Sequence, residues 1–111
     1  MTIKPVKWLG DSRARIRAFP ADPRREAGHQ LGRVQVGAEP ADRKPMPSVG
    51  LGVSEIRIRD SSGAYRMIYV AKFSEAVYVL HAFQKKARKT SKPDIDLAGK
   101  RFRELVQERK R

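Results

Sequence analysis

The chain has 111 residues and no cysteine, and 25 Lys and Arg against 12 Asp and Glu give it a formal net charge of +13. This length is typical of a single domain, which we expect to span residues 1–111, and it leaves little room for a deep cavity between two lobes. The absence of cysteine excludes disulfide bonds, thiol catalysis and cysteine-based zinc sites. With only two histidines and no cysteine, we expect no metal site. We also expect no cofactor.

The positive charge predicts a polyanionic partner. Counterion release makes phosphate backbones the favoured ligands, so nucleic acid is the first expectation, with an acidic protein or simple solubility as the alternatives. No segment has the roughly 18–20 apolar residues needed to span a bilayer, and the first twenty residues lack the apolar core of a signal peptide. We therefore expect a cytoplasmic protein with no membrane partner.

The first half of the chain predicts an extended segment and two helices. The extended segment ends at a turn over residues 10–12, and a short helix follows over residues 13–19. Asp22 as an N-cap and Pro23 at the first helical position predict a second helix that ends at Gly37. Three prolines and three glycines in residues 37–52 predict a loop without regular structure.

The second half predicts three strands and a helix. Residues 53–59 alternate, which places Ile56 and Ile58 on one face and Glu55, Arg57 and Arg59 on the other. A turn at residues 60–63 and strands over residues 65–70 and 76–83 complete an antiparallel meander. After a basic stretch over residues 84–92, Pro93 opens a last helix, and residues 109–111 form a frayed tail. The fold class is therefore α+β, a small twisted antiparallel sheet with helices packed on one side.

Two sequence blocks resemble one known family. Residues 55–66 read Glu-Ile-Arg-Ile-Arg-Asp-x-x-Gly-x-Tyr-Arg, and residues 80–86 read Leu-His-x-Phe-x-Lys-Lys. Together they resemble the phage-related, HigB-type branch of the RelE/ParE toxin superfamily, which belongs to bacterial type II toxin–antitoxin modules. The resemblance extends from about residue 7 to residue 105.

The resemblance implies a minimal microbial RNase fold and a ribosome-dependent mRNA endoribonuclease, or mRNA interferase. In this reaction the 2′-hydroxyl attacks the adjacent phosphorus without a metal ion. The implied partners are mRNA, the A site of the ribosome and a cognate helix-turn-helix antitoxin. Two other readings stay open: a non-catalytic ParE-like toxin that inhibits gyrase, and an inactive relative that only binds nucleic acid.

The implied reaction needs a base, an acid and fixed cations near the phosphorane. Arg66 matches the phosphate-binding arginine of the superfamily, and Arg57 matches a position that often carries a functional lysine or arginine. A solvated basic strand face is the alternative for both, and for Arg59. Lys85 and Lys86 match the family's Lys-Lys pair, and neighbouring cations would lower the pKa of a lysine there and make it a better proton donor.

Glu55 and His81 are the remaining catalytic candidates. The related toxins carry a lysine at the position of Glu55. Glu55 is either a general base, weakened because nearby arginines lower its pKa, or a partner in a cross-strand ion pair. His81 titrates in a useful range, but the alternation of Val77, Val79, His81 and Phe83 places it on the apolar face, where a buried histidine is the alternative.

Five residues are predicted to bind RNA without taking part in the chemistry. Tyr65 is a candidate for stacking on a base, although strand aromatics more often belong to the core. The basic residues of this set are Arg59, Arg88, Lys89 and Lys92.

Overall fold

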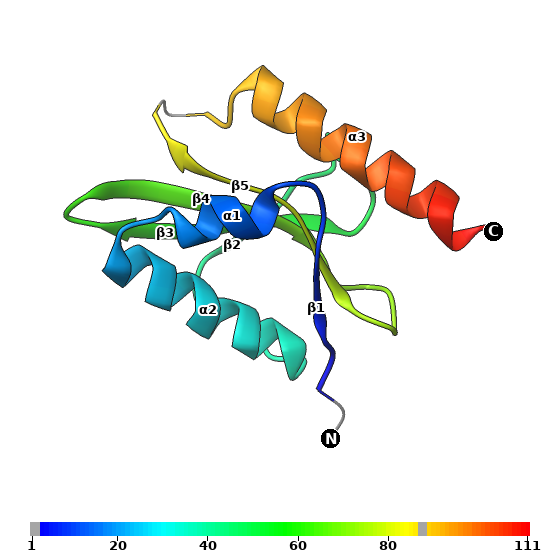
Figure 1. Ribbon diagram of the computed structural model, residues 1–111, viewed down its shortest axis with the longest axis horizontal. Coiled ribbons are helices and arrows are strands. Elements are labelled where there is room, and N and C mark those ends of the chain that lie inside the picture. The colour runs from blue at the N-terminus through cyan, green and yellow to red at the C-terminus, as the bar shows by residue number, and fades with distance from the viewer. Residues whose placement is uncertain (1–2, 87–88) are drawn as a thin grey trace.

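A five-stranded sheet in the order β1-β5-β4-β3-β2 forms the centre of the computed structural model, which describes residues 3–86 and 89–111 (Figure 1). β1 runs parallel to β5, and all other neighbours are antiparallel. The strands are β1 (Val6–Trp8), β2 (Arg43–Pro45), β3 (Val53–Asp60), β4 (Gly63–Val70) and β5 (Val77–Lys85). The meander predicted from the second half of the sequence is confirmed as β3, β4 and β5.

The segment over residues 37–52 was expected to lack regular structure, and this prediction was wrong at β2. The three residues of β2 pair with Ile56, Glu55 and Ser54 of β3. Pro45 is tolerated because β2 lies at the edge of the sheet, where a missing N–H does not interrupt the ladder. β2 thereby brings Lys44 opposite Glu55.

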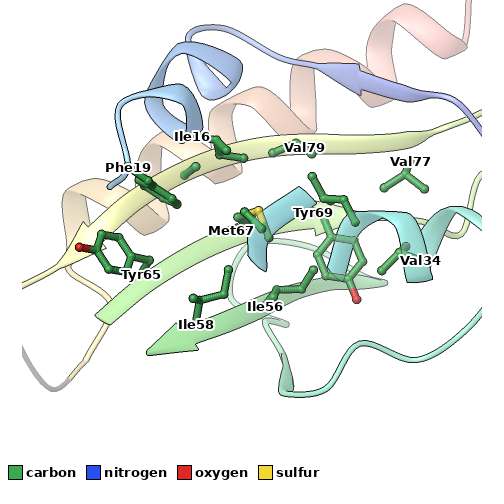
Figure 2. Close-up of a cluster of buried hydrophobic side chains, with 13 residues drawn as sticks. Ile16, Phe19, Val34, Ile56, Ile58, Tyr65, Met67, Tyr69, Val77 and Val79 are labelled. Carbon is green, nitrogen blue, oxygen red and sulfur yellow. The ribbon is translucent and has the colours of Figure 1, made fainter. Parts of the chain in front are cut away.

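Two helices, α1 (Ser12–Arg17) and α2 (Ala21–Gln35), cover one face of the sheet. Ile16 of α1 and Val34 of α2 belong to the same buried cluster as Ile56 and Met67 of the sheet (Figure 2). The predicted inward position of Ile56 and Ile58 is therefore confirmed. This cluster is one of two apolar cores, which lie on opposite faces of the sheet.

The predicted start of the second helix was wrong by two residues. α2 begins at Ala21, Pro20 is its N-cap, and the Pro20 carbonyl accepts a hydrogen bond from Arg24 N at 2.9 Å. Pro23 therefore lies at the third helical position. A proline is tolerated there because the first N–H groups of a helix have no intrahelical partner.

The third helix, α3 (Lys92–Arg109), packs against the other face of the sheet, over β5. Ala98, Phe102 and Leu105 form its buried stripe, at the spacing of one helix face. Ser91 caps the helix by accepting a hydrogen bond from Asp94 N at 3.3 Å. The α+β class is confirmed, with α1 and α2 on one face and α3 on the opposite one.

The C-terminal tail begins later than expected. Arg109 belongs to the last turn of α3, its Nε donates to Glu75 Oε2 at 2.6 Å, and its guanidinium lies 3.8 Å from the centre of the Phe73 ring. The sequence predicted that Arg109 is frayed because its partners lie in the β4–β5 connection, far from it in the sequence.

A β-bulge in β5 decides which side chains face α3. Ile68 pairs with His81 and Tyr69 pairs with Val79, so Leu80 is an extra residue in β5. The bulge turns His81 and Phe83 away from the face of Val79, against the simple alternation expected from the sequence. It also brings Lys85 to the same face as Arg66, because Phe83 pairs with Arg66.

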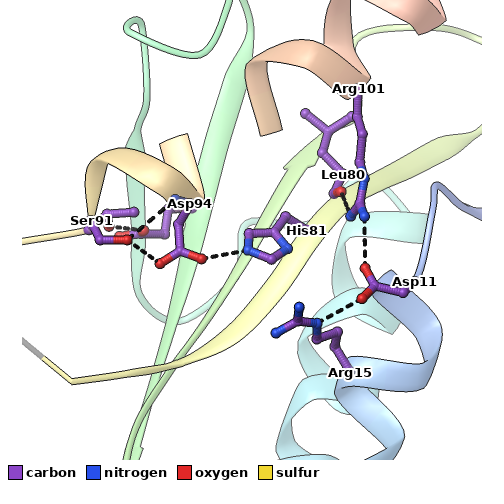
Figure 3. Close-up of polar contacts among 9 residues, drawn as sticks. Asp11, Arg15, Leu80, His81, Ser91, Asp94 and Arg101 are labelled. Atoms are coloured by element: carbon purple, nitrogen blue, oxygen red, sulfur yellow. Dashed lines mark hydrogen bonds and ion pairs between the residues drawn. The ribbon is translucent and has the colours of Figure 1, made fainter. Parts of the chain in front are cut away.

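A polar network fastens α3 to β5 and α1 (Figure 3). Arg101 donates to the Leu80 carbonyl and to Asp11 Oδ1, both at 2.8 Å, and Arg15 Nε donates to Asp11 Oδ2 at 2.9 Å. The hydrogen bonds from Arg15 and Arg101 lower the pKa of Asp11 to about 2. The Asp11 carboxylate therefore stays charged at neutral pH and holds both arginines.

Two glycine substitutions test the packing of α3. A Cβ at Gly50 would overlap the Phe102 ring, so Gly50→Ala is expected to lower the free energy of unfolding by about 1–3 kcal/mol. Gly28 is exposed within α2 and a Cβ there meets nothing, so Gly28→Ala is expected to raise it by about 0.5–1 kcal/mol. Urea unfolding of both variants checks this, and equal stabilities would contradict the packing.

Candidate nucleic-acid interface

A groove of about 350 Å³ opens on the α3 face of the sheet, beside the start of α3. β2, β3 and β5 each contribute charged residues to it, and Lys89 and Thr90, just before α3, form one wall. Its charged and hydroxyl-bearing lining residues are Lys44, Ser48, Glu55, Arg57, Lys85, Lys89 and Thr90. Four cations therefore surround a single carboxylate.

Glu55 and Arg66 form a buried ion pair beneath this groove. Each is only 2% exposed, and Arg66 Nε lies 3.3 Å from Glu55 Oε1. Burial lowers the pKa of Arg66, and the charge of Glu55 opposes that shift. Arg66 also donates from Nη1 to the Tyr65 carbonyl at 3.1 Å. The cross-strand ion pair, one of the two roles expected for Glu55, is present in the structure.

The second oxygen of Glu55 is also occupied. Thr90 Oγ1 donates to Glu55 Oε2 at 2.6 Å, across 35 positions of sequence. The carboxylate thus holds an arginine on the protein side and a hydroxyl on the groove side. Glu55 and Arg66 are therefore buried and not on a solvated strand face, and Thr90 contacts Glu55 from the groove wall.

Lys85 ends β5 at the groove. Partial burial and the nearby charges of Arg66, Lys44 and Arg57 lower the pKa of Lys85 below the ordinary 10.5, and Glu55 opposes the shift. The direction agrees with the expectation that neighbouring cations act on this lysine. A lysine of lowered pKa gives up its proton more readily, as a general acid must.

Arg57 is held at the rim of the groove by Asp42. Its Nε and Nη2 both donate to Asp42 Oδ1, at 2.9 and 2.7 Å, and its side chain is 39% exposed. Arg57 also pairs across the strands with Arg66. It therefore presents a fixed guanidinium to the groove while Arg66 lies beneath.

The other predicted basic residues are more scattered. Lys89 lines the groove, and Lys86 is exposed just after β5. Arg59 lies on the same face of β3 but lines a neighbouring hollow beside the start of α2. Lys92 bonds Asp96 in the first turn of α3 at 2.8 Å, and Arg88 lies outside the described residues.

Tyr65 lies on the opposite face of the sheet. It is 1% exposed, its ring centre is 4.8 Å from that of Phe19, and its hydroxyl lies 2.7 Å from Ser62 Oγ (Figure 2). The predicted stacking on a base does not fit this position, because the ring belongs to the core beneath α1. The alternative expected for a strand aromatic is the one observed.

His81 is buried where α3 begins. Its Nε2 lies 2.7 Å from Asp94 Oδ1 (Figure 3). Its ring stacks on Phe83 with centres 5.1 Å apart. Burial lowers the pKa of His81 below 6.5, and Asp94 opposes the shift. Its Nδ1 has no hydrogen-bond partner among the described residues, which suits a neutral ring. The arrangement is that of a histidine that anchors α3.

Sequence reasoning missed Lys44 and Thr90 as parts of the site. Lys44 was assigned to a loop, and only its pairing with Glu55 brings it to the groove. Thr90 stands among basic residues and carries no signal of its own. Both residues lie within the span, from about residue 7 to residue 105, that the family resemblance covers.

The sequence of this chain matches, over residues 14–103, the family described as Phage derived protein Gp49-like (DUF891). The chain belongs to this Gp49-like family. The match includes all of α2, β3, β4 and β5 and every lining residue of the groove. No curated protein matches the chain. Over residues 3–86 and 89–111 of this Gp49-like protein, no helix combines the length and apolar character that crossing a membrane requires.

The buried ion pair predicts a strong coupling between two variants. Glu55→Met or Arg66→Met alone strands a buried charge and is expected to lower the free energy of unfolding by about 3–5 kcal/mol. The double variant removes both charges and is expected to recover most of that loss. Urea denaturation of the four proteins measures the coupling, and additive losses would contradict the pairing.

The buried His81 predicts a pH-dependent stability. Its pKa is lowered in the folded protein, so the unfolded chain takes up a proton first as the pH falls below 6.5. The contribution of the neutral His81 to the free energy of unfolding is therefore fully present above pH 6.5 and declines below it, until His81 is protonated in the folded protein as well. His81→Gln should flatten this part of the profile in thermal unfolding between pH 5 and 8, a range of about three units chosen around the histidine reference pKa.

The exposed His29 of α2 offers the matched control. His29→Gln should leave the decline below pH 6.5 in place. A profile that His29→Gln flattens and His81→Gln does not would refute the assignment.

Proposed function

We propose that this Gp49-like chain is the toxin of a type II toxin–antitoxin module and cleaves mRNA on the ribosome. The observation that carries the proposal is the groove itself, in which Lys44, Arg57 and Lys85 surround a carboxylate. Family membership and the resemblance to HigB-type toxins support it. The net charge of +13 favours approach to RNA.

The cations are suited to the charge that develops on phosphorus. Arginine binds two phosphate oxygens through its planar fork, and Arg57 is held in place by Asp42. Lys44 and Lys85 lie on the strands at either side of β3 and β4. A phosphate in the groove would therefore meet positive charge from more than one direction, which stabilises a pentacoordinate transition state.

The two proton transfers fall to different residues in this proposal. Lys85, with its lowered pKa, donates a proton to the 5′ leaving oxygen. Glu55 accepts the proton of the attacking 2′-hydroxyl. Arg66 is a positioning residue, because its burial beneath Glu55 keeps it from the phosphate and fixes the carboxylate.

The proposed setting follows from the same resemblance. The substrate is mRNA in the ribosomal A site, in the cytoplasm, and a cognate helix-turn-helix antitoxin restrains the toxin. A basic protein with a groove of this kind needs such a partner, because a free groove would act on the cell's own messages.

Substitutions at Lys85 test the proposal. Lys85→Met is expected to lower cleavage of a defined message on ribosomes by about 100- to 10,000-fold. Lys85→Arg keeps the charge but a guanidinium does not release its proton, so it is expected to retain RNA binding and lose cleavage. Primer extension maps the cuts, with a ribosome-free reaction beside it.

Lys100→Met serves as the matched control, since Lys100 is exposed on α3 and its Nζ lies 3.9 Å from Glu104 Oε1. It removes the same charge and is expected to cleave as the unaltered protein does. Intact message on ribosomes together with direct inhibition of gyrase supercoiling would overturn the nuclease in favour of a ParE-like toxin.

A further inference from the structure

The Thr90 hydroxyl occupies the groove side of the buried carboxylate. Its Oγ1 donates to Glu55 Oε2 at 2.6 Å, while Arg66 lies at the other oxygen. Glu55 is 2% exposed, and Thr90 is half-buried in the groove wall. Thr90 therefore stands between the carboxylate and anything that enters the groove.

The hydrogen bond from Thr90 to Glu55 is chemically the same as one from a ribose hydroxyl to a carboxylate that acts as a general base. An aliphatic hydroxyl donates a short, charge-assisted hydrogen bond to a carboxylate that is held from behind. A ribose 2′-hydroxyl entering from the groove would donate the same bond to the same oxygen. A deoxyribose has no hydroxyl to offer there.

We infer that the Thr90 hydroxyl in the free protein occupies the position, here called the ribose seat, that the attacking 2′-hydroxyl takes when RNA binds. RNA displaces Thr90 from Glu55 Oε2, and DNA, which lacks this hydroxyl, does not, so the ribose seat selects RNA over DNA. The inference deepens the proposed function and rests on its assignment of RNA to the groove. Thr90 is a positioning residue in this scheme, because it holds Glu55 and then leaves.

The exchange keeps Glu55 Oε2 hydrogen-bonded when RNA binds. The Thr90 hydroxyl returns to solvent as the 2′-hydroxyl takes its place, so Glu55 keeps an acceptor bond throughout. With DNA, Glu55 either keeps Thr90, which blocks the seat, or remains buried with an unpaired oxygen, which is costly. The competition from Thr90 also lowers the affinity for RNA by the worth of one hydrogen bond.

The chemical step then balances. The 2′-oxygen forms its bond to phosphorus as Glu55 takes the hydroxyl proton, and the bond from phosphorus to the 5′-oxygen breaks as Lys85 protonates that oxygen. The products are a 2′,3′-cyclic phosphate and a 5′-hydroxyl. Solvent restores both side chains to their starting protonation states.

The test compares the affinities of purified protein for single-stranded RNA and for DNA of the same sequence at one fixed salt concentration. Thr90→Val keeps the shape and removes the competing hydroxyl, so the ratio of RNA to DNA affinity should rise roughly three- to tenfold. Thr90→Ser keeps the hydroxyl and should leave the ratio unchanged. Fluorescence anisotropy measures binding, and a gel confirms that the RNA stays intact.

A second measurement uses the unaltered protein, in case Thr90→Val does not fold. The methyl resonance of Thr90 should shift on addition of RNA and much less with DNA. An equal response to both nucleic acids, or a Thr90→Val variant that changes both affinities by the same factor, would overturn the inference.

Neither readout requires cleavage. Absence of cleavage on ribosomes together with a Thr90-dependent RNA preference would remove the proposed nuclease and leave the ribose seat standing. Cleavage on ribosomes with an unchanged affinity ratio would keep the nuclease and remove the seat.

Discussion

The buried ion pair of Glu55 and Arg66 is the constraint on which the α3 face of this molecule depends. Two charges at 2% exposure are stable only if each remains within reach of the other, so the register of β3 and β4 is fixed at this point. A shift of β3 by one residue against β4 would turn Glu55 to the apolar face beneath α2 and away from Arg66. The same pair holds a carboxylate at the floor of the groove with one oxygen directed to its wall.

The bulge in β5 divides this face into an apolar half and a charged half. The extra residue, Leu80, turns toward α3 with His81, and both are buried there. Beyond the bulge, Lys85 emerges next to the ion pair, where the wall formed by Thr90 replaces helix cover. The apolar half anchors α3, and the charged half stays open to a ligand.

The anchoring of α3 and the chemistry of the groove are linked through one short segment. Asp94, in the first turn of α3, bonds His81, and Thr90, four residues earlier, bonds Glu55. A helix held firmly at its start therefore also sets the position of the groove wall. The buried His81 is thus connected to the groove wall through Asp94 and the start of α3.

Local patterns in the sequence determined the β3–β4 hairpin, the inward position of Ile56 and Ile58, the apolar stripe of α3 and the excess of cations after β5. These features repeat at the spacing of a strand or a helix, so neighbouring residues suffice to predict them. Only the tertiary structure decided that Glu55 and Arg66 are buried together and that Lys44 and Thr90 belong to the site. Those outcomes depend on strand register, on a bulge and on contacts across as many as 35 positions, which no local pattern encodes.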